Sequence, residues 1–328
     1  MRKHIINAVS GIVIGGFFLF ITLRNKPLDD IFDLLRTARA SWIILGLVFL
    51  VIMFFFRAYR WKLLMENNGN SPGIRNVSYS LLLGFFINSF TPKLGEVIRC
   101  TSLKKSSDIP VSNSFGTVVS ERIYDLLVLV LAVVLILVIE SGRLGNLVKE
   151  AFSSLKTSVS GNLLNLFLAF LGLALFIYTL VRIFKRYHIM TKIRDFLREL
   201  WTTVKKTFRI RSYRTFIFQT FMIWFLMGLV NYCCLRSLPS TENLNMYFAF
   251  VVLFVGTIGW AIPSPGGIGT SHFFVLQLFL LFNMTEQTGV AYGILINGIT
   301  VLFTIFGGLL AIILVNSFKL VRQEVKSE

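Results

Sequence analysis

The sequence has 328 residues, of which 55% are hydrophobic and 15% charged, and its mean hydropathy is +0.73. A soluble domain of this length needs a more polar surface, so the composition indicates an integral membrane protein. The apolar runs are too long for barrel strands and do not alternate with polar residues. We therefore expect a single all-α membrane domain over residues 1–328, a polytopic helical bundle.

The net charge of +17 follows the membrane topology rather than a nucleic-acid signature. From Arg182 to Arg214 there are 11 Lys or Arg residues and only two acidic ones. This bias predicts a basic cytoplasmic loop at 183–214, which would attract anionic inner-leaflet lipids. No nucleic-acid-binding motif accompanies the charge, so we expect no nucleic acid partner. The three cysteines and three histidines are too scattered to suggest a disulfide framework, a metal site or a cofactor.

Six full spans are predicted near residues 5–23, 41–60, 115–139, 161–183, 215–236 and 289–316. The first has a basic start, an apolar core of about 19 residues and no cleavage pattern, so an uncleaved span is favoured over a signal peptide. The loop charges place both termini in the cytoplasm. The oligomeric state stays open.

Two features flank the second span. Before it, Leu28, Ile31, Phe32 and Leu35 recur at helical spacing, which predicts a short amphipathic helix lying in the membrane interface. At its end, FFFRAYRWKLLM combines basic and aromatic residues. This pattern is typical of an interfacial anchor, formed here by Arg57, Arg60 and Trp61.

Two apolar segments are interrupted by helix breakers, near 77–103 and near 246–282. Each half is shorter than the roughly 20 residues that a span requires, so both are predicted to be re-entrant hairpins. The loop charges make them enter from opposite sides, one in a first half (1–140) and one in a second half (161–328). Interrupted segments at corresponding positions are the signature of a transporter site near the midplane. An inverted repeat is therefore expected from topology alone.

Three charged residues, Glu121, Arg122 and Asp125, begin the span at 115–139. At about 100° per residue they share one helix face. Such charges are expensive in a bilayer and are normally paired. They either pin helices together or form a site in which Arg122 binds a lipid phosphate and the carboxylates orient it.

The segment NSFTPKLGEVIR, at the first interruption, offers further polar groups. Glu96 and Arg99 are three residues apart and would be neighbours on a helix that starts near Pro92. They form either an internal salt bridge or, with Asn88 and Lys93, part of a headgroup site.

The segment IPSPGGIGTSH forms the second interruption. Its prolines end one half-helix, and Gly266, Gly267 and Gly269 permit positive φ. Thr270 or Ser271 could cap the helix that follows, with His272 in its first turn. The segment is either a tight structural turn or an anion site built on free amides at a helix N-terminus.

Taken in order, RAYRW, NSFTPKLGEVIR, SERIYD and PSPGGIGTSH resemble the flippase-like membrane domain of the lysylphosphatidylglycerol synthase family over nearly the whole chain. The family's P-x-x-x-G-E-x-x-R pattern falls on Pro92, Gly95, Glu96 and Arg99, its E-R-x-x-D pattern on Glu121, Arg122 and Asp125, and its P-x-P-G-G-x-G pattern on Pro263, Pro265, Gly266, Gly267 and Gly269. Members often have an acidic residue shortly after the last glycine, where this chain has His272.

The resemblance implies a lipid-moving activity in the cytoplasmic membrane of a bacterium or archaeon. Bifunctional members add a soluble transferase domain, and because the sequence ends about 12 residues after the last predicted span, we expect no transferase activity. We expect a translocase for a phospholipid or polyprenyl-phosphate lipid, in which Arg99 and Arg122 hold the phosphate. The alternatives are a non-catalytic lipid-binding partner of an envelope glycosyltransferase and, with less support, a membrane enzyme acting on lipid-linked substrates.

The predicted lipid-binding residues are Asn88, Pro92, Lys93, Glu96, Arg99, Glu121, Arg122, Asp125, Gly266, Gly267, Gly269, Thr270 and His272.

Overall fold

The computed structural model describes residues 2–140 apart from 25 and 27, residues 198 and 202, and residues 212–327. The predicted span at 161–183 and almost all of the basic loop at 183–214 lie outside these residues. Residues 1–129 and 203–328 form one compact unit, and residues 130–202 belong to another. All helices described below contribute to the first unit.

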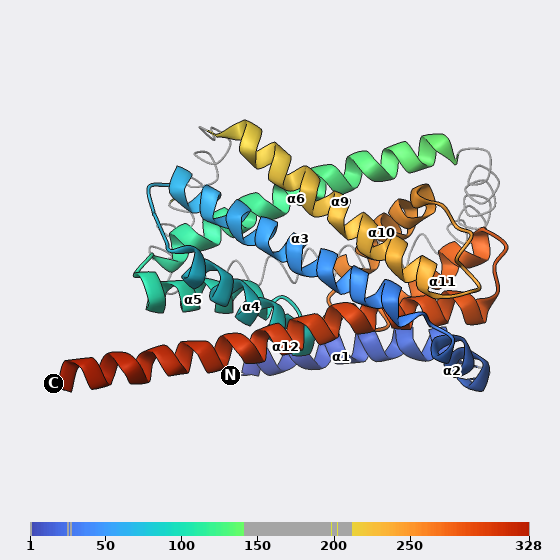
Figure 1. Cartoon of the computed structure of the whole chain (residues 1–328), viewed down its shortest axis with the longest axis horizontal. Coiled ribbons are helices and arrows are strands. Elements are labelled where there is room, and N and C mark those ends of the chain that lie inside the picture. The colour runs from blue at the N-terminus through green and yellow to red at the C-terminus, as the bar shows by residue number, and fades with distance from the viewer. Residues whose placement is uncertain are drawn as a thin grey trace, which may run out of the picture. The chain divides into compact units, whose positions relative to one another are not determined.

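The described elements are helical. They are α1 (Arg2–Leu23), α2 (Leu28–Arg36), α3 (Ala40–Asn67), α4 (Ile74–Phe90), α5 (Leu94–Ser107), α6 (Val111–Ile139), α9 (Tyr213–Ser237), α10 (Met246–Ala261), the 3₁₀ turn η1 (Pro265–Gly267), α11 (Thr270–Leu281) and α12 (Glu286–Ser327) (Figure 1).

Four of these helices are long and apolar enough to cross a membrane: α3, α6, α9 and residues 286–313 of α12. They match four of the predicted spans, and α1 covers the predicted first one. The chain is therefore a multi-pass helical membrane protein. Each of these helices begins before its predicted first residue, and α3, α9 and α12 also end after their predicted last residue. Polar residues at the helix ends account for the added length.

The predicted amphipathic helix is present as α2, and its apolar face is divided. Ile31 is buried in a cluster with Leu276 and Val290, whereas Leu28 and Phe32 are exposed. The buried residue attaches α2 to α11 and α12, and the exposed ones leave part of the apolar face without a protein contact.

Both interrupted segments form helical hairpins. Helices α4 and α5 pack together across a break at Thr91–Lys93, and α10 packs on α11 across a longer break that contains η1. These four helices have 12 to 17 residues, fewer than a span requires. The order long, short, short, long thus occurs twice, in α3–α6 and in α9–α12. The orientation of the hairpins in a bilayer stays a prediction.

Close approach at glycines holds each hairpin shut. A Cβ added at Gly95 would lie 1.9 Å from the carbonyl oxygen of Gly84, and one at Gly259 would lie 2.6 Å from the Cα of Ser271. Small residues at helix crossings let backbones approach closely, which is how apolar helices gain packing energy when no water is expelled between them. The hairpin geometry therefore depends on these positions.

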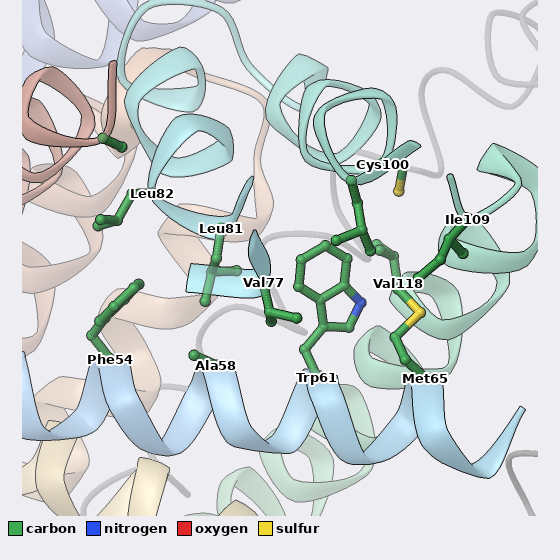
Figure 2. Packing of buried hydrophobic residues seen from close by; sticks show 12 residues of the cluster. Phe54, Ala58, Trp61, Met65, Val77, Leu81, Leu82, Cys100, Ile109 and Val118 are labelled. Atoms are coloured by element: carbon green, nitrogen blue, oxygen red, sulfur yellow. The ribbon is translucent and has the colours of Figure 1, made fainter. Parts of the chain in front are cut away.

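Helix α3 packs along α9, and the two helices run antiparallel (Figure 1). Near one end Trp42 stacks edge-on against Tyr232, and near the other Arg60 donates to the Thr220 hydroxyl at 3.3 Å. The opposite face of α3 carries Phe54, Ala58, Trp61 and Met65, which point toward α4, α5 and α6 in the main apolar cluster (Figure 2).

This packing corrects the predicted interfacial anchor. Arg60 and Trp61 are fully buried, and the Trp61 indole donates to the Thr117 hydroxyl at 3.0 Å. Only Arg57 of the three keeps some exposure, 17% of its side chain. The basic-aromatic pattern that marks a membrane boundary on an isolated span here serves contacts with α6, which the local sequence of α3 does not reveal.

We predict that Gly95→Ala destabilises the protein, because the added methyl overlaps backbone atoms of α4. Overpacking of this kind costs about 1–3 kcal/mol. Thermal unfolding of the detergent-solubilised protein should show a lower Tm than wild type. Gly298→Ala is the control, since nothing lies within 4 Å of its Cβ position. Equal Tm values for the two variants would contradict the role assigned to Gly95.

Candidate functional site

A buried ionic cluster joins α3, α5 and α6. Arg60 donates to both carboxylate oxygens of Asp125, at 2.8 and 3.1 Å, and to Glu121 at 3.1 Å. Arg99 approaches the other oxygen of Glu121, also at 3.1 Å. Glu121 has no exposed surface, and its carboxylate is shared by two hydrogen-bonded guanidinium groups.

Helical spacing explains how α6 serves this cluster. Glu121 and Asp125 are four residues apart, so both carboxylates face α3 from successive turns. A buried charge is tolerated when it is paired and hydrogen-bonded, and removal of one partner leaves the other uncompensated. Glu121 therefore links α6 to α3 through Arg60 and to α5 through Arg99.

The same geometry places Arg99 away from the expected headgroup position. Its guanidinium lies over the Trp61 ring, 4.8 Å from the centroid, and its side chain is 3% exposed. The pairing expected within the helix, Glu96 with Arg99, is replaced by two pairs between helices. Glu96 pairs with Arg122 at 3.1 Å, and Arg99 pairs with Glu121.

A cavity of about 410 Å³ lies beside this cluster, lined by residues of α3 to α6, of α9 to α12 and of the turns of both hairpins. Of the predicted lipid-binding residues, it is lined by Asn88, Pro92, Lys93, Glu96, Arg122, Asp125 and Gly266. Its charged lining is thus formed by the hairpin turn at Lys93, the Glu96–Arg122 pair, Asp125 and Arg57. Six predicted residues do not line it: Arg99, Glu121, Gly267, Gly269, Thr270 and His272.

Asn88 shapes the first hairpin. Its side-chain oxygen accepts from the Gly95 N–H at 2.8 Å, in the first turn of α5. Lys93, just before α5, has a left-handed backbone with φ of 63°. Pro92 therefore lies in the turn and does not begin the helix. The sharp reversal brings Lys93 and Glu96 to the cavity.

The second turn uses its own amide groups. Gly267 N–H donates to Ser264 O at 3.2 Å, and Gly269 N–H donates to the His272 Nδ1 at 3.3 Å. Gly266, Gly267 and Gly269 all have positive φ, as the sequence predicts. Gly269, rather than Thr270 or Ser271, is the N-cap of α11. The amides of Gly267 and Gly269 thus have acceptors within the turn, and the anion site expected at this helix N-terminus stays a prediction.

A polar contact behind that turn is not predicted by the sequence motifs. The Asn297 amide, buried in α12, donates to Gly266 O at 3.1 Å and to Ser271 Oγ at 3.0 Å. Asn297 and Ser271 both line the cavity. A lone Asn within an apolar span was the available signal, since polar groups at that depth need partners.

The exposed lining residues mark where the cavity opens. Six lining residues are more than a third exposed: Lys93, Arg122, Leu126, Trp260, Ala261 and Pro263. The opening therefore has two charged side chains beside apolar ones. In the described part of the chain, no three His, Cys, Asp or Glu side chains gather as metal ligands would.

Comparison with known proteins identifies the family. The family model described as the lysylphosphatidylglycerol synthase TM region matches residues 8–308. The chain belongs to this family. The match extends over both hairpins, three of the described spans and most of the fourth, which confirms the resemblance carried by the sequence motifs.

Relatives come from archaea. The chain is 29% identical to the UPF0104 membrane protein MJ1595 of Methanocaldococcus jannaschii over 128 residues, 38% of each chain. It is 28% identical to the UPF0104 membrane protein MJ1078 of the same organism, over 64% of this chain and 85% of the relative. The first match thus spans well under half of that relative's length. No solved structure matches the chain.

We predict that Glu121→Gln strongly destabilises the fold. The change leaves Arg60 and Arg99 facing a neutral amide, and breaking a buried ion pair costs about 3–5 kcal/mol. Thermal unfolding in detergent measures the effect. Glu66→Gln is the matched control, because Glu66 pairs with Lys62 at a partly exposed site, where a loss of about 1 kcal/mol or less is expected. A Tm for Glu121→Gln equal to that of the control would contradict the pinning role.

Proposed function

We propose that the protein translocates a lipid across the membrane, with the headgroup in the cavity beside Asp125 and the acyl chains outside it. The observation that carries this proposal is the cavity itself, because its charged lining opens past Arg122 and Leu126 at the side of α6. A headgroup needs polar partners, whereas its chains gain by staying among apolar side chains.

The volume and the lining support a lipid headgroup over a larger cargo. About 410 Å³ is the size of a small-molecule site. Paired short hairpins facing one cavity are the arrangement by which transporters expose a site alternately to the two sides. The family description supports a lipid-related role, and translocation is our proposal beyond it.

We further propose that the lipid is a phospholipid or polyprenyl-phosphate lipid and that the protein moves it without chemical change. The protein would lie in the cytoplasmic membrane with both termini in the cytoplasm. The support for that orientation is the distribution of Lys and Arg among the predicted loops.

We predict that the purified protein, reconstituted in liposomes, moves fluorescent phospholipid between leaflets, measured by quenching with a membrane-impermeant reductant. Arg122→Ala should slow transport about tenfold, since loss of one charge-assisted contact is worth about 1.5 kcal/mol or more. Arg36→Ala is the control: Arg36 is an exposed cation paired with Asp33 on α2, away from the cavity.

Two outcomes would contradict this proposal. Leaflet exchange no faster than in protein-free liposomes would exclude translocation of the tested lipid and would favour a non-catalytic lipid-binding role. Equal rates for Arg122→Ala, Arg36→Ala and wild type would remove Arg122 from the transport path.

A further inference from the structure

The cavity contains a guanidinium group whose hydrogen-bonding capacity is unused. Arg57 lies 3.5 Å from a Glu121 oxygen through Nε and 3.6 Å from an Asp125 oxygen through Nη2. These are ion-pair separations without hydrogen-bond geometry, and the buried Nε has no acceptor among the described residues. By contrast, Arg60 and Arg99 donate hydrogen bonds to these same carboxylates. Arg57 is thus held in place by charge while its donors stay available.

A second donor in the same cavity is also unused. The Trp224 indole N–H is buried and finds no acceptor within the described part of the chain, although buried indole groups usually have one. Trp224 lines the cavity from α9, and its ring stacks on Phe254 with a centroid separation of 5.2 Å. The ring is fixed by packing, and its N–H has no acceptor among the described residues.

The register of α3 against α9 brings these donors to one level. Arg60 bonds Thr220, and the helices run antiparallel. Arg57 precedes Arg60 by nearly one turn, and Trp224 follows Thr220 by about one turn. Because α3 and α9 are antiparallel, a step toward the N-terminus of α3 and a step toward the C-terminus of α9 lead in the same direction along the helix pair. Arg57 and Trp224 therefore line the cavity at about the same depth.

The charge around them favours an anion. Five cations, Arg57, Arg60, Lys93, Arg99 and Arg122, face three carboxylates, Glu96, Glu121 and Asp125. Both carboxylates that line the cavity are already paired, Asp125 with Arg60 and Glu96 with Arg122. An incoming cationic group would find no uncommitted carboxylate there, whereas a phosphate would meet donors without acceptors.

We propose that Arg57 and Trp224 bind the phosphate of the transported lipid and select a headgroup of net negative charge over a zwitterionic one. The guanidinium fork suits two phosphate oxygens, and the indole N–H supplies a third bond from the side. This inference rests on the proposed lipid-binding role of the cavity and names its substrate class. The sequence motif suggests Arg99 for this role. Arg99 instead pairs with Glu121 and so acts as a positioning residue, which holds that carboxylate in place.

The test is lipid retention by the full chain in neutral detergent, measured by native mass spectrometry after incubation with equal amounts of phosphatidic acid and phosphatidylcholine. Wild type should retain phosphatidic acid preferentially. Arg57→Gln should lower its retention about tenfold, the effect of losing charge-assisted hydrogen bonds. Arg57→Lys, which keeps the charge and loses the fork, should lie between the two.

Trp224→Phe provides a second variant, because it keeps a stacked ring and removes only the N–H. We expect it to weaken phosphatidic acid retention severalfold with unchanged Tm. Trp224→Phe still tests the site if Arg57→Gln does not fold because Glu121 has lost a cationic partner. Arg75→Gln is the matched control, an exposed arginine on α4 that does not line the cavity.

The possible results separate the sources of phosphate and the two proposals. Displacement of phosphatidic acid by millimolar inorganic phosphate would assign these donors to free phosphate and overturn the headgroup assignment. Wild-type retention and selectivity in both Arg57→Gln and Trp224→Phe would also overturn it, even if liposome transport is intact. If these variants lose selective retention but the wild type does not transport lipid in liposomes, the binding site is supported and the proposed translocase function is contradicted.

Discussion

Burial of Glu121 is the constraint on which the rest of the described unit depends. A carboxylate with no exposed surface in a membrane domain requires cationic partners, and these come from α3 through Arg60 and from α5 through Arg99. Three segments far apart in the sequence must therefore meet at one point. The short helix α5 is held there from one side by its glycine contact with α4 and from the other by Arg99.

The cavity is a consequence of that meeting. Because Arg60 takes both oxygens of Asp125 and Arg99 takes Glu121, the guanidinium of Arg57 is left close to both carboxylates without bonding either. The hairpin turn then brings Lys93 and the Glu96–Arg122 pair to the same space. The residues of this cluster thus have two roles. The fully buried ones hold the helices together, and the partly exposed ones face the cavity.

The second hairpin contributes shape rather than charge. Its three glycines, Gly266, Gly267 and Gly269, have positive φ, and the amides of Gly267, Ile268 and Gly269 bond within the turn. Asn297 from α12 fixes the carbonyl of Gly266 and the hydroxyl of Ser271, both at the cavity wall. The two broken helices therefore play unlike parts, one with ionised side chains and one with a rigid neutral turn, although their helix lengths follow the same order.

The sequence by itself determined the membrane class, four of the described spans and both hairpins, because apolar run length and the positions of Pro and Gly act locally. It also located the residues that line the cavity at Asn88, Lys93, Glu96, Arg122 and Asp125. Only the tertiary structure decided which ionic partners meet. Arg99 pairs with Glu121, Arg60 and Trp61 are buried, and the Arg57 Nε has no acceptor among the described residues. The physical reason is that a charge in a low-dielectric interior takes whichever partner packing brings within reach, and helical spacing within one segment does not specify which helix will face it.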